Sequence, residues 1–311
     1  MNEKVKLLTD NIEKVIVGKT DSVLKIITAM LCGGHVLIED VPGVGKTQLV
    51  SALARSVDGK YNRIQLTPDV MPSDIVGFSM IDQKTHELEY KEGVAMCNFL
   101  LADEINRASP KSQSSLLEVM EEHQISIDGK THELPLPFMV LATQNPVEQE
   151  GTYKLPEAQL DRFLMKITMD YPSLEEEVDI LERHHTNASL IKLDDIKPAI
   201  TKEELLSLRA FMNQVFVDRT LLQYIALIVQ QTRTSKAVYL GASPRASVAM
   251  LQASKAYALL QGRDFVTPED IKFVAPYVLQ HRLILTAEAE MEGYSPVKVT
   301  QRLIDKVEVP K

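Results

Sequence analysis

The chain has 311 residues, 45% hydrophobic and 25% charged, a composition typical of a soluble globular protein with one large domain or two ordinary ones. Its 34 basic and 43 acidic residues give a formal net charge of −9, which argues against a broadly basic nucleic-acid-binding surface. No apolar run reaches the roughly 18 residues of a membrane span, and charges interrupt the N-terminus where a signal peptide would be apolar. The two cysteines offer neither a disulfide framework nor a metal-ligand spacing. We therefore expect a cytoplasmic protein without direct membrane insertion.

Residues 1–172 alternate short apolar runs with helical patterns. The runs that predict strands cover residues 35–38, 63–66, 98–102, 138–143 and 163–167. The longer runs are apolar throughout, as strands buried on both faces are. Strands that alternate with helices pair in parallel through right-handed crossovers, so this part predicts a three-layer α/β domain.

Two excursions interrupt this alternation. Segments 124–127 and 130–134 flank Asp128-Gly129, a strong signal for a hairpin with a type I′ turn. The hairpin falls between two strands of the predicted main sheet, so we interpret it as an insertion. The polar stretch 82–87 predicts a second hairpin or a loop.

Strand signals stop after residue 172. Ser173 can cap a helix whose first turn is acidic, and Thr267 followed by Pro268 is another clear helix start. We expect a second, all-helical domain over residues 173–311.

Residues 40–47, which read DVPGVGKT, end as a phosphate-binding loop does, with an aspartate in place of the usual first glycine. Gly43 and Gly45 would let backbone amides converge on phosphate oxygens. Lys46 would reach the β- and γ-phosphates, and the Thr47 hydroxyl would hold Mg²⁺. The alternative is a glycine-proline loop with an exposed lysine.

The surroundings of this loop favour the functional interpretation. A strand candidate precedes it, and a good helix pattern from Gln48 follows, whose N-terminus would face the anion. The carboxylate of Asp40 should point away from a triphosphate, because facing it would be repulsive.

Polar side chains follow two of the predicted strands. Asp103 and Glu104 come directly after strand 98–102, at the carboxyl edge where open α/β sheets bind ligands. Asp103 would coordinate Mg²⁺ and Glu104 would polarise the attacking water; the alternative is two solvated acids at a helix start. Asn145 follows strand 138–143 and could orient the same water, or could be an ordinary turn residue before proline.

Two arginines complete the set of candidates. Arg162 could be an arginine finger that stabilises transition-state charge, or an ion-pair partner of Asp161. Arg245 lies in the first turn of a helix that Ser243 caps and Pro244 begins. A cation there is disfavoured by the helix dipole, which hints at contact with a γ-phosphate, although an exposed arginine is the alternative.

Together these stretches resemble the AAA+ ATPases, and within them the MoxR family. The matching segments, in the expected order, are residues 39–47, 101–108, 142–146, 151–163 and 241–245. The resemblance implies a P-loop NTPase domain and a helical lid. It also implies a Walker A loop, a Walker B motif at Asp103 and Glu104, sensor 1 at Asn145, an arginine finger at Arg162 and sensor 2 at Arg245.

The resemblance further implies a nucleotide-binding surface. Its candidate residues are Val17, Gly18, Pro42, Gly43, Val44, Gly45, Lys46, Thr47 and Gln48. The hairpin at 124–134 resembles a presensor 1 hairpin, and the excursion at 77–93 resembles a helix 2 insertion. Residues 91–94 depart from the Pro-Gly-Pro of relatives there.

The function implied is Mg²⁺-dependent ATP hydrolysis in a ring of subunits, as a hexamer, with Arg245 acting in its own subunit and Arg162 on its neighbour's nucleotide. Members of the family remodel or activate partner proteins, often partners with a von Willebrand factor A domain, which this chain would find in a separate protein. The competing interpretations are a chelatase-like motor subunit, a DNA-associated AAA+ motor and a non-hydrolysing nucleotide switch. The negative charge argues against the DNA motor, and Glu104 argues against the switch.

Overall fold

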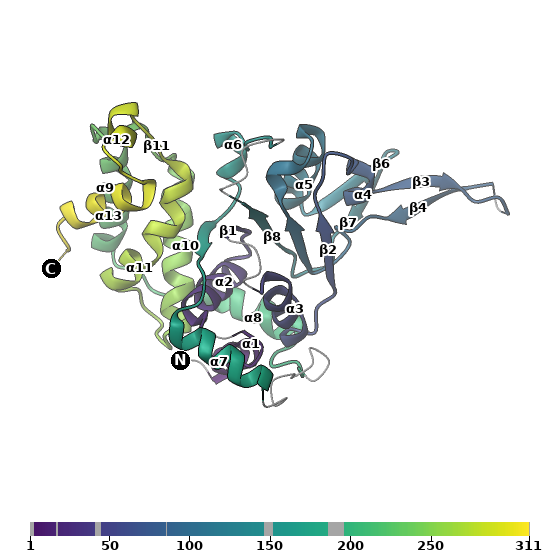
Figure 1. Ribbon diagram of the computed structural model, residues 1–311, viewed down its shortest axis with the longest axis horizontal. Coiled ribbons are helices and arrows are strands. Elements are labelled where there is room, and N and C mark those ends of the chain that lie inside the picture. Colours follow the sequence, from purple (N-terminus) through teal and green to yellow (C-terminus); the bar gives the residue numbers. More distant parts are fainter. Residues whose placement is uncertain are drawn as a thin grey trace.

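A parallel five-stranded sheet forms the centre of the computed structural model, which describes residues 3–16, 18–40, 45–84, 86–145, 152–185 and 196–310 (Figure 1). Its strand order is β2-β5-β8-β1-β9, and all its pairings are parallel. The strands are β1 (Val36–Asp40), β2 (Tyr61–Gln65), β5 (Phe99–Asp103), β8 (Met139–Gln144) and β9 (Met165–Met169). Each coincides with a predicted strand to within two residues.

Helices cover both faces of the sheet because successive strand residues point to opposite sides. Leu101 and Leu141 pack with α1 (Glu3–Glu13), α2 (Thr20–Cys32) and α3 (Lys46–Ser56) in one core cluster. Leu100 and Val140 pack in the other cluster, with α4 (Pro72–Val76) and α5 (Pro110–Glu122). The predicted three-layer α/β fold is thereby confirmed.

Two hairpins project from this domain on the side away from the C-terminal helices (Figure 1). Strands β6 (Gln124–Ile127) and β7 (Lys130–Glu133) are antiparallel, and Asp128 and Gly129 between them have φ angles of 51° and 74°. Positive φ at both central residues is the requirement of a type I′ turn, as predicted. The polar stretch 82–87 joins β3 (Gly77–Ile81) to β4 (Leu88–Glu92), so this excursion is also a hairpin.

The remainder of the chain is mostly helical. The helices are α7 (Leu174–His185), α8 (Lys202–Met212), α9 (Arg219–Thr234), α10 (Pro244–Leu260), α11 (Pro268–Leu279), α12 (Ala287–Met291) and α13 (Pro296–Lys306). The expectation of an all-helical region is incomplete, because β10 (Val238–Leu240) pairs antiparallel with β11 (Ile284–Leu285). Strands of three and two residues are too short to show an alternating pattern.

Helix α8 packs against the α/β part, since Arg209 Nε donates to the Met30 carbonyl at 3.0 Å. The domain boundary at 172/173 stays a prediction. Within the described ranges, no helix combines the length and the apolar character needed to cross a bilayer.

Candidate functional site

The register of the sheet brings the predicted site residues to one edge. Ala102 pairs with Ala142, which places Asp103 beside Thr143 at the carboxyl ends of β5 and β8. Ile38 pairs with Thr143, which brings the end of β1 to the same edge on the other side of β8. Asn145 follows directly after β8 and is half-buried there. The topology thus gathers the two acidic residues, the amide and the end of β1 at one edge.

The segment after β1 ends in a glycine that starts a helix. Gly45 has a φ of 85° and is the N-cap of α3, so Lys46 and Thr47 lie in the first turn, two residues earlier than the predicted helix start at Gln48. First-turn amides have no acceptor within the helix, and glycine has no side chain to supply one. These amides therefore suit an anionic ligand.

Part of the predicted cradle is not described. Val17, Pro42, Gly43 and Val44 lie outside the described residues, as does the side chain of Asp40. Their predicted roles stay predictions.

Asp103 is 3% exposed, and both its carboxylate oxygens are hydrogen-bonded. Arg63 Nε donates to Oδ2 at 2.7 Å, and Thr143 Oγ1 donates to Oδ1 at 3.3 Å. Thr143 Oγ1 also accepts from the backbone amide of Glu104 at 2.9 Å. One hydroxyl therefore links the two acidic residues and fixes both at the end of β5.

Glu104 has a left-handed backbone with a φ of 57°. For a residue other than glycine, such a conformation costs on the order of 1–3 kcal/mol and persists where the surroundings impose it. Its carboxylate is half-exposed and Oε2 accepts from Arg107 Nη1 at 3.1 Å. An exposed pair of this kind contributes little to stability. The side chain is therefore held near the edge of the sheet by its backbone more than by its ion pair.

Arg162 and Arg245 converge on one carboxylate of α5. Arg162 Nη2 lies 2.9 Å from Glu121 Oε2, and Arg245 Nη2 lies 3.6 Å from Glu121 Oε1. Arg162 Nη1 also donates to the Leu117 carbonyl at 2.7 Å. The alternative partner, Asp161, instead pairs with Arg282 at 2.6 Å. Two guanidinium groups share one anion here, so positive charge is in excess at this contact.

Gly18 permits a close approach of α7. It has a φ of 70°, and a Cβ built on it would lie 2.1 Å from the Glu176 carboxyl carbon. A side chain at this position would therefore require the Glu176 side chain to move, and the positive φ would strain any residue other than glycine.

Sequence reasoning missed four residues that hold the candidates in place: Arg63, Thr143, Glu121 and Arg282. Thr143 carried a signal, because it is the polar end of an apolar strand next to Asn145. Glu121 and Arg282 carried none, since their partners come from elements distant in sequence.

The residues at this edge suit a magnesium-bound nucleotide. Thr47 and Asp103 offer oxygen ligands, which Mg²⁺ prefers, and the ion usually takes one or two carboxylates together with substrate phosphates. In the part of the chain that the structure describes, no cluster of three or more His, Cys, Asp or Glu could hold another metal. The donor set therefore fits Mg²⁺ with a phosphate ligand.

Comparisons with known proteins give the family models that the chain matches. Residues 35–165 match the model of the ATPase family associated with various cellular activities (AAA), and residues 230–305 match the AAA lid domain. The protein YeaC of Bacillus subtilis is 49% identical over 304 residues, covering 97% of this chain and 93% of that protein.

Two further relatives cover nearly the whole chain. Chaperone MoxR1 of Mycobacterium tuberculosis is 43% identical over 309 residues, covering 96% of this chain and 81% of that protein. The crystal structure of a candidate ATPase from Cytophaga hutchinsonii superposes with a TM-score of 0.91 at 40% identity, covering 99% of this chain and 95% of the other.

Proposed function

Since the chain belongs to the MoxR family of AAA+ ATPases, we propose that it hydrolyses Mg²⁺-bound ATP at the carboxyl edge of its sheet to remodel a client protein. The observation that carries this proposal is the Thr143 hydroxyl, which ties the Asp103 carboxylate to the backbone of Glu104 beside the start of α3. A parallel sheet that presents acids next to an uncapped helix start suits phosphoryl chemistry.

Each group of site residues would have a separate role in the reaction. The first-turn amides of α3 and Lys46 would bind the phosphates, while Thr47 and Asp103 would hold Mg²⁺, which neutralises charge on the phosphate oxygens. Glu104 would accept a hydrogen bond from the attacking water and polarise it, and Asn145 would help orient that water. The reaction would depend on positioning and charge neutralisation.

Arg162 and Arg245 would act as a pair on one nucleotide. Both contact Glu121 of the same protomer, and the Arg245 side chain is 65% exposed with a long ion pair at 3.6 Å, so it can turn to an incoming phosphate. This favours a revision of the sequence-based hypothesis, which divided the two arginines between two sites. We propose a ring, as a hexamer, in which both complete the neighbouring subunit's site.

Replacing Glu104 by Gln tests the chemistry. Because an amide cannot accept the water's proton, we expect turnover to fall by roughly 10²–10⁴ while the affinity for a fluorescent ATP analogue stays. Glu118→Gln, an exposed acid on α5, is the control and should keep full turnover. Undiminished hydrolysis by Glu104→Gln would remove this residue from the mechanism.

Replacing Lys46 by Ala tests the binding site. Loss of the cation that faces the phosphates should abolish measurable nucleotide affinity. Lys111→Ala, which removes an exposed cation at the start of α5, should bind normally. Equal affinity in the two variants would refute the phosphate-binding role of Lys46.

The client is the remaining part of the proposal. Similarity to a relative named as a chaperone supports a client protein, and from the family resemblance we propose that this client has a von Willebrand factor A domain. Glu104→Gln loaded with ATP should retain the client, while Lys46→Ala should not. Mass spectrometry of the two captures would contradict the proposal if no protein with such a domain were enriched on the loaded variant.

A further inference from the structure

We propose that Asp161, Ser243 and Arg282 form an arginine-positioning clamp, which holds Arg162 and Arg245 at a fixed separation in one protomer. The inference rests on the proposed roles of those two arginines. It assigns no chemistry to the three clamp residues, which act through the arginines that they place.

The clamp is centred on a buried arginine whose hydrogen-bonding capacity is fully used. Arg282 lies in the 3₁₀ turn η3 (Gln280–Arg282), and its side chain is 5% exposed. Its Nε donates to Asp161 Oδ1 at 2.6 Å, and Nη2 donates to the carbonyls of Asp161 at 3.1 Å and Phe163 at 2.7 Å. Nη1 donates to the carbonyls of Leu164, at 3.2 Å, and Val278. These contacts account for all five donors of a guanidinium.

Most of these acceptors belong to the short segment that carries Arg162. The carbonyls of Asp161, Phe163 and Leu164 surround the Arg162 backbone on both sides. The two residues before Arg282 strengthen the contact, since His281 Nε2 donates to the Phe163 carbonyl at 3.0 Å and Gln280 Nε2 donates to the Lys166 carbonyl. Turn η3 therefore fixes the path of the chain through Arg162.

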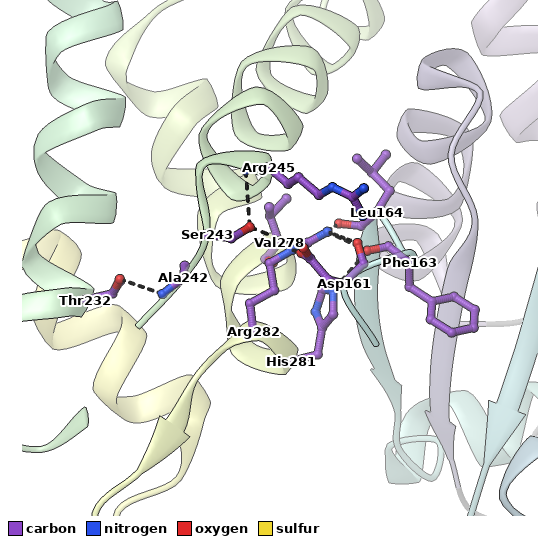
Figure 2. A network of polar contacts seen from close by, with 10 residues as sticks. All are labelled: Asp161, Phe163, Leu164, Thr232, Ala242, Ser243, Arg245, Val278, His281 and Arg282. Atoms are coloured by element: carbon purple, nitrogen blue, oxygen red, sulfur yellow. Dashed lines mark hydrogen bonds and ion pairs between the residues drawn. The ribbon is translucent and has the colours of Figure 1, made fainter. Parts of the chain in front are cut away.

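The second oxygen of Asp161 extends the clamp to Arg245. Ser243 Oγ donates to Asp161 Oδ2 at 3.2 Å and accepts from the Arg245 amide at 3.2 Å, as Figure 2 shows. A hydroxyl has one proton to donate and lone pairs to accept, so both contacts coexist. The same serine thus caps α10 and links the start of that helix to the residue before Arg162.

The two arginines meet again at Glu121. From Arg162 the contacts run through Asp161 and Ser243 to Arg245, and back through the shared Glu121 carboxylate. The two arginines are therefore connected both through the clamp residues and through Glu121, which would fix the distance between them. Asp161 directly precedes one proposed phosphate-contacting cation and Ser243 stands two residues before the other. A displacement of about 1 Å in a positioning group can cost on the order of 10²-fold in rate.

Ser243→Ala tests the clamp with the smallest change. We expect kcat to fall tenfold or more with KM for ATP unchanged, since the arginines act on transition-state charge. The variant also loses the N-cap of α10, which lowers stability independently of any positioning role. Ser295→Ala is the matched control, because Ser295 Oγ caps α13 by accepting from Lys298 N at 3.3 Å, and this variant should keep full kcat.

A double-variant cycle separates positioning from general stabilisation. In an Arg245→Ala background, Ser243→Ala should cause no further loss of kcat, because the group that it positions is gone. Arg282→Lys keeps the positive charge but reduces the number of N–H donors from five to three. This variant should have a lower kcat and an unchanged affinity for ATP.

The proposal is overturned if Ser243→Ala behaves as Ser295→Ala does, or if its loss of kcat persists undiminished without Arg245. Full kcat in Arg245→Ala itself would also overturn it. The proposed hydrolysis is judged separately, because it stands or falls with Glu104→Gln.

Discussion

His35 is buried with both ring nitrogens engaged, at the start of the strand that leads to the candidate site. Nδ1 accepts from the Val140 amide at 2.9 Å and Nε2 donates to the Met120 carbonyl at 3.0 Å, so the ring is neutral. Burial lowers the pKa of His35 from 6.5 to about 4. Burial also lowers the pKa of His281, whose Nε2 contacts Phe163.

Both histidines make stability depend on pH. Between pH 6.5 and about 4 the unfolded chain binds a proton at His35 that the folded chain refuses, so stability is full above pH 6.5 and falls as the pH drops. From pH 7.5 to 5.5 the loss from His35 should be about 1.4 kcal/mol. Urea unfolding at pH 7.5 and 5.5 should show that the free energy of unfolding changes less between these pH values in His35→Gln than in the wild type. His185→Gln, which replaces an exposed histidine of α7, is the control and should behave as the wild type does. An equal change in the free energy of unfolding in all three proteins would contradict the expectation.

The gathering of the candidate site residues at one edge of the sheet was predictable, and the contacts of Arg282 that hold the segment around Arg162 were not. Lys46, Thr47, Asp103 and Glu104 follow apolar strands in a recognisable order, and parallel pairing sends the ends of those strands to one edge. The contacts of Arg282 depend instead on how the 3₁₀ turn meets a segment more than 100 residues away, which no local pattern encodes.

At the scale of elements, the turn between β6 and β7 has a conformation that its two central residues determine. Asp128 and Gly129 both have positive φ, and a Cβ added to Gly129 would meet nothing within 4 Å. Gly129→Ala should therefore lower the free energy of unfolding through the backbone alone, by about 1–2 kcal/mol. Asp128→Asn should be neutral, since asparagine tolerates this conformation. Thermal or urea unfolding measures the stability of both variants. An unchanged stability in Gly129→Ala would contradict the prediction and show that the hairpin relaxes to another turn.

The elements that escaped prediction are the smallest. Strands β10 and β11 form a ladder in which Val238 pairs with Leu285, and neither strand is long enough to alternate. Helix starts were easier to find because a single residue marks them. Thr267 and Ser243 are N-caps where expected, followed by Pro268 and Pro244.

For the whole molecule, the fold class and the family followed from the sequence, while the strand order did not. Alternating strands and helices imply parallel pairing, but they do not say that β1 lies between β8 and β9. The matches to relatives over nearly the whole chain confirm the MoxR assignment.

A mixing experiment at this scale tests whether both arginines serve a neighbour. Subunits with Lys46→Ala keep their arginines but should lack nucleotide, and subunits with Arg162→Ala and Arg245→Ala keep nucleotide but lack the cations. Each protein by itself should be inactive. Mixed rings should recover ATP turnover, because one subunit supplies the nucleotide and the next supplies both arginines. Mixtures as inactive as their components, with light scattering showing that mixed rings form, would rule out this division of roles.

The serine-capped end of α10 has a mechanical consequence. The helix has 17 residues and is therefore about 25 Å long, and it packs against α2 and α11 along its course. Rotated by about 5° around Ser243, a rod of that length would move its far end by about 2 Å. If Arg245 contacts a phosphate as proposed, a small adjustment there would be converted by the length of α10 into a larger displacement at the far end of the helix.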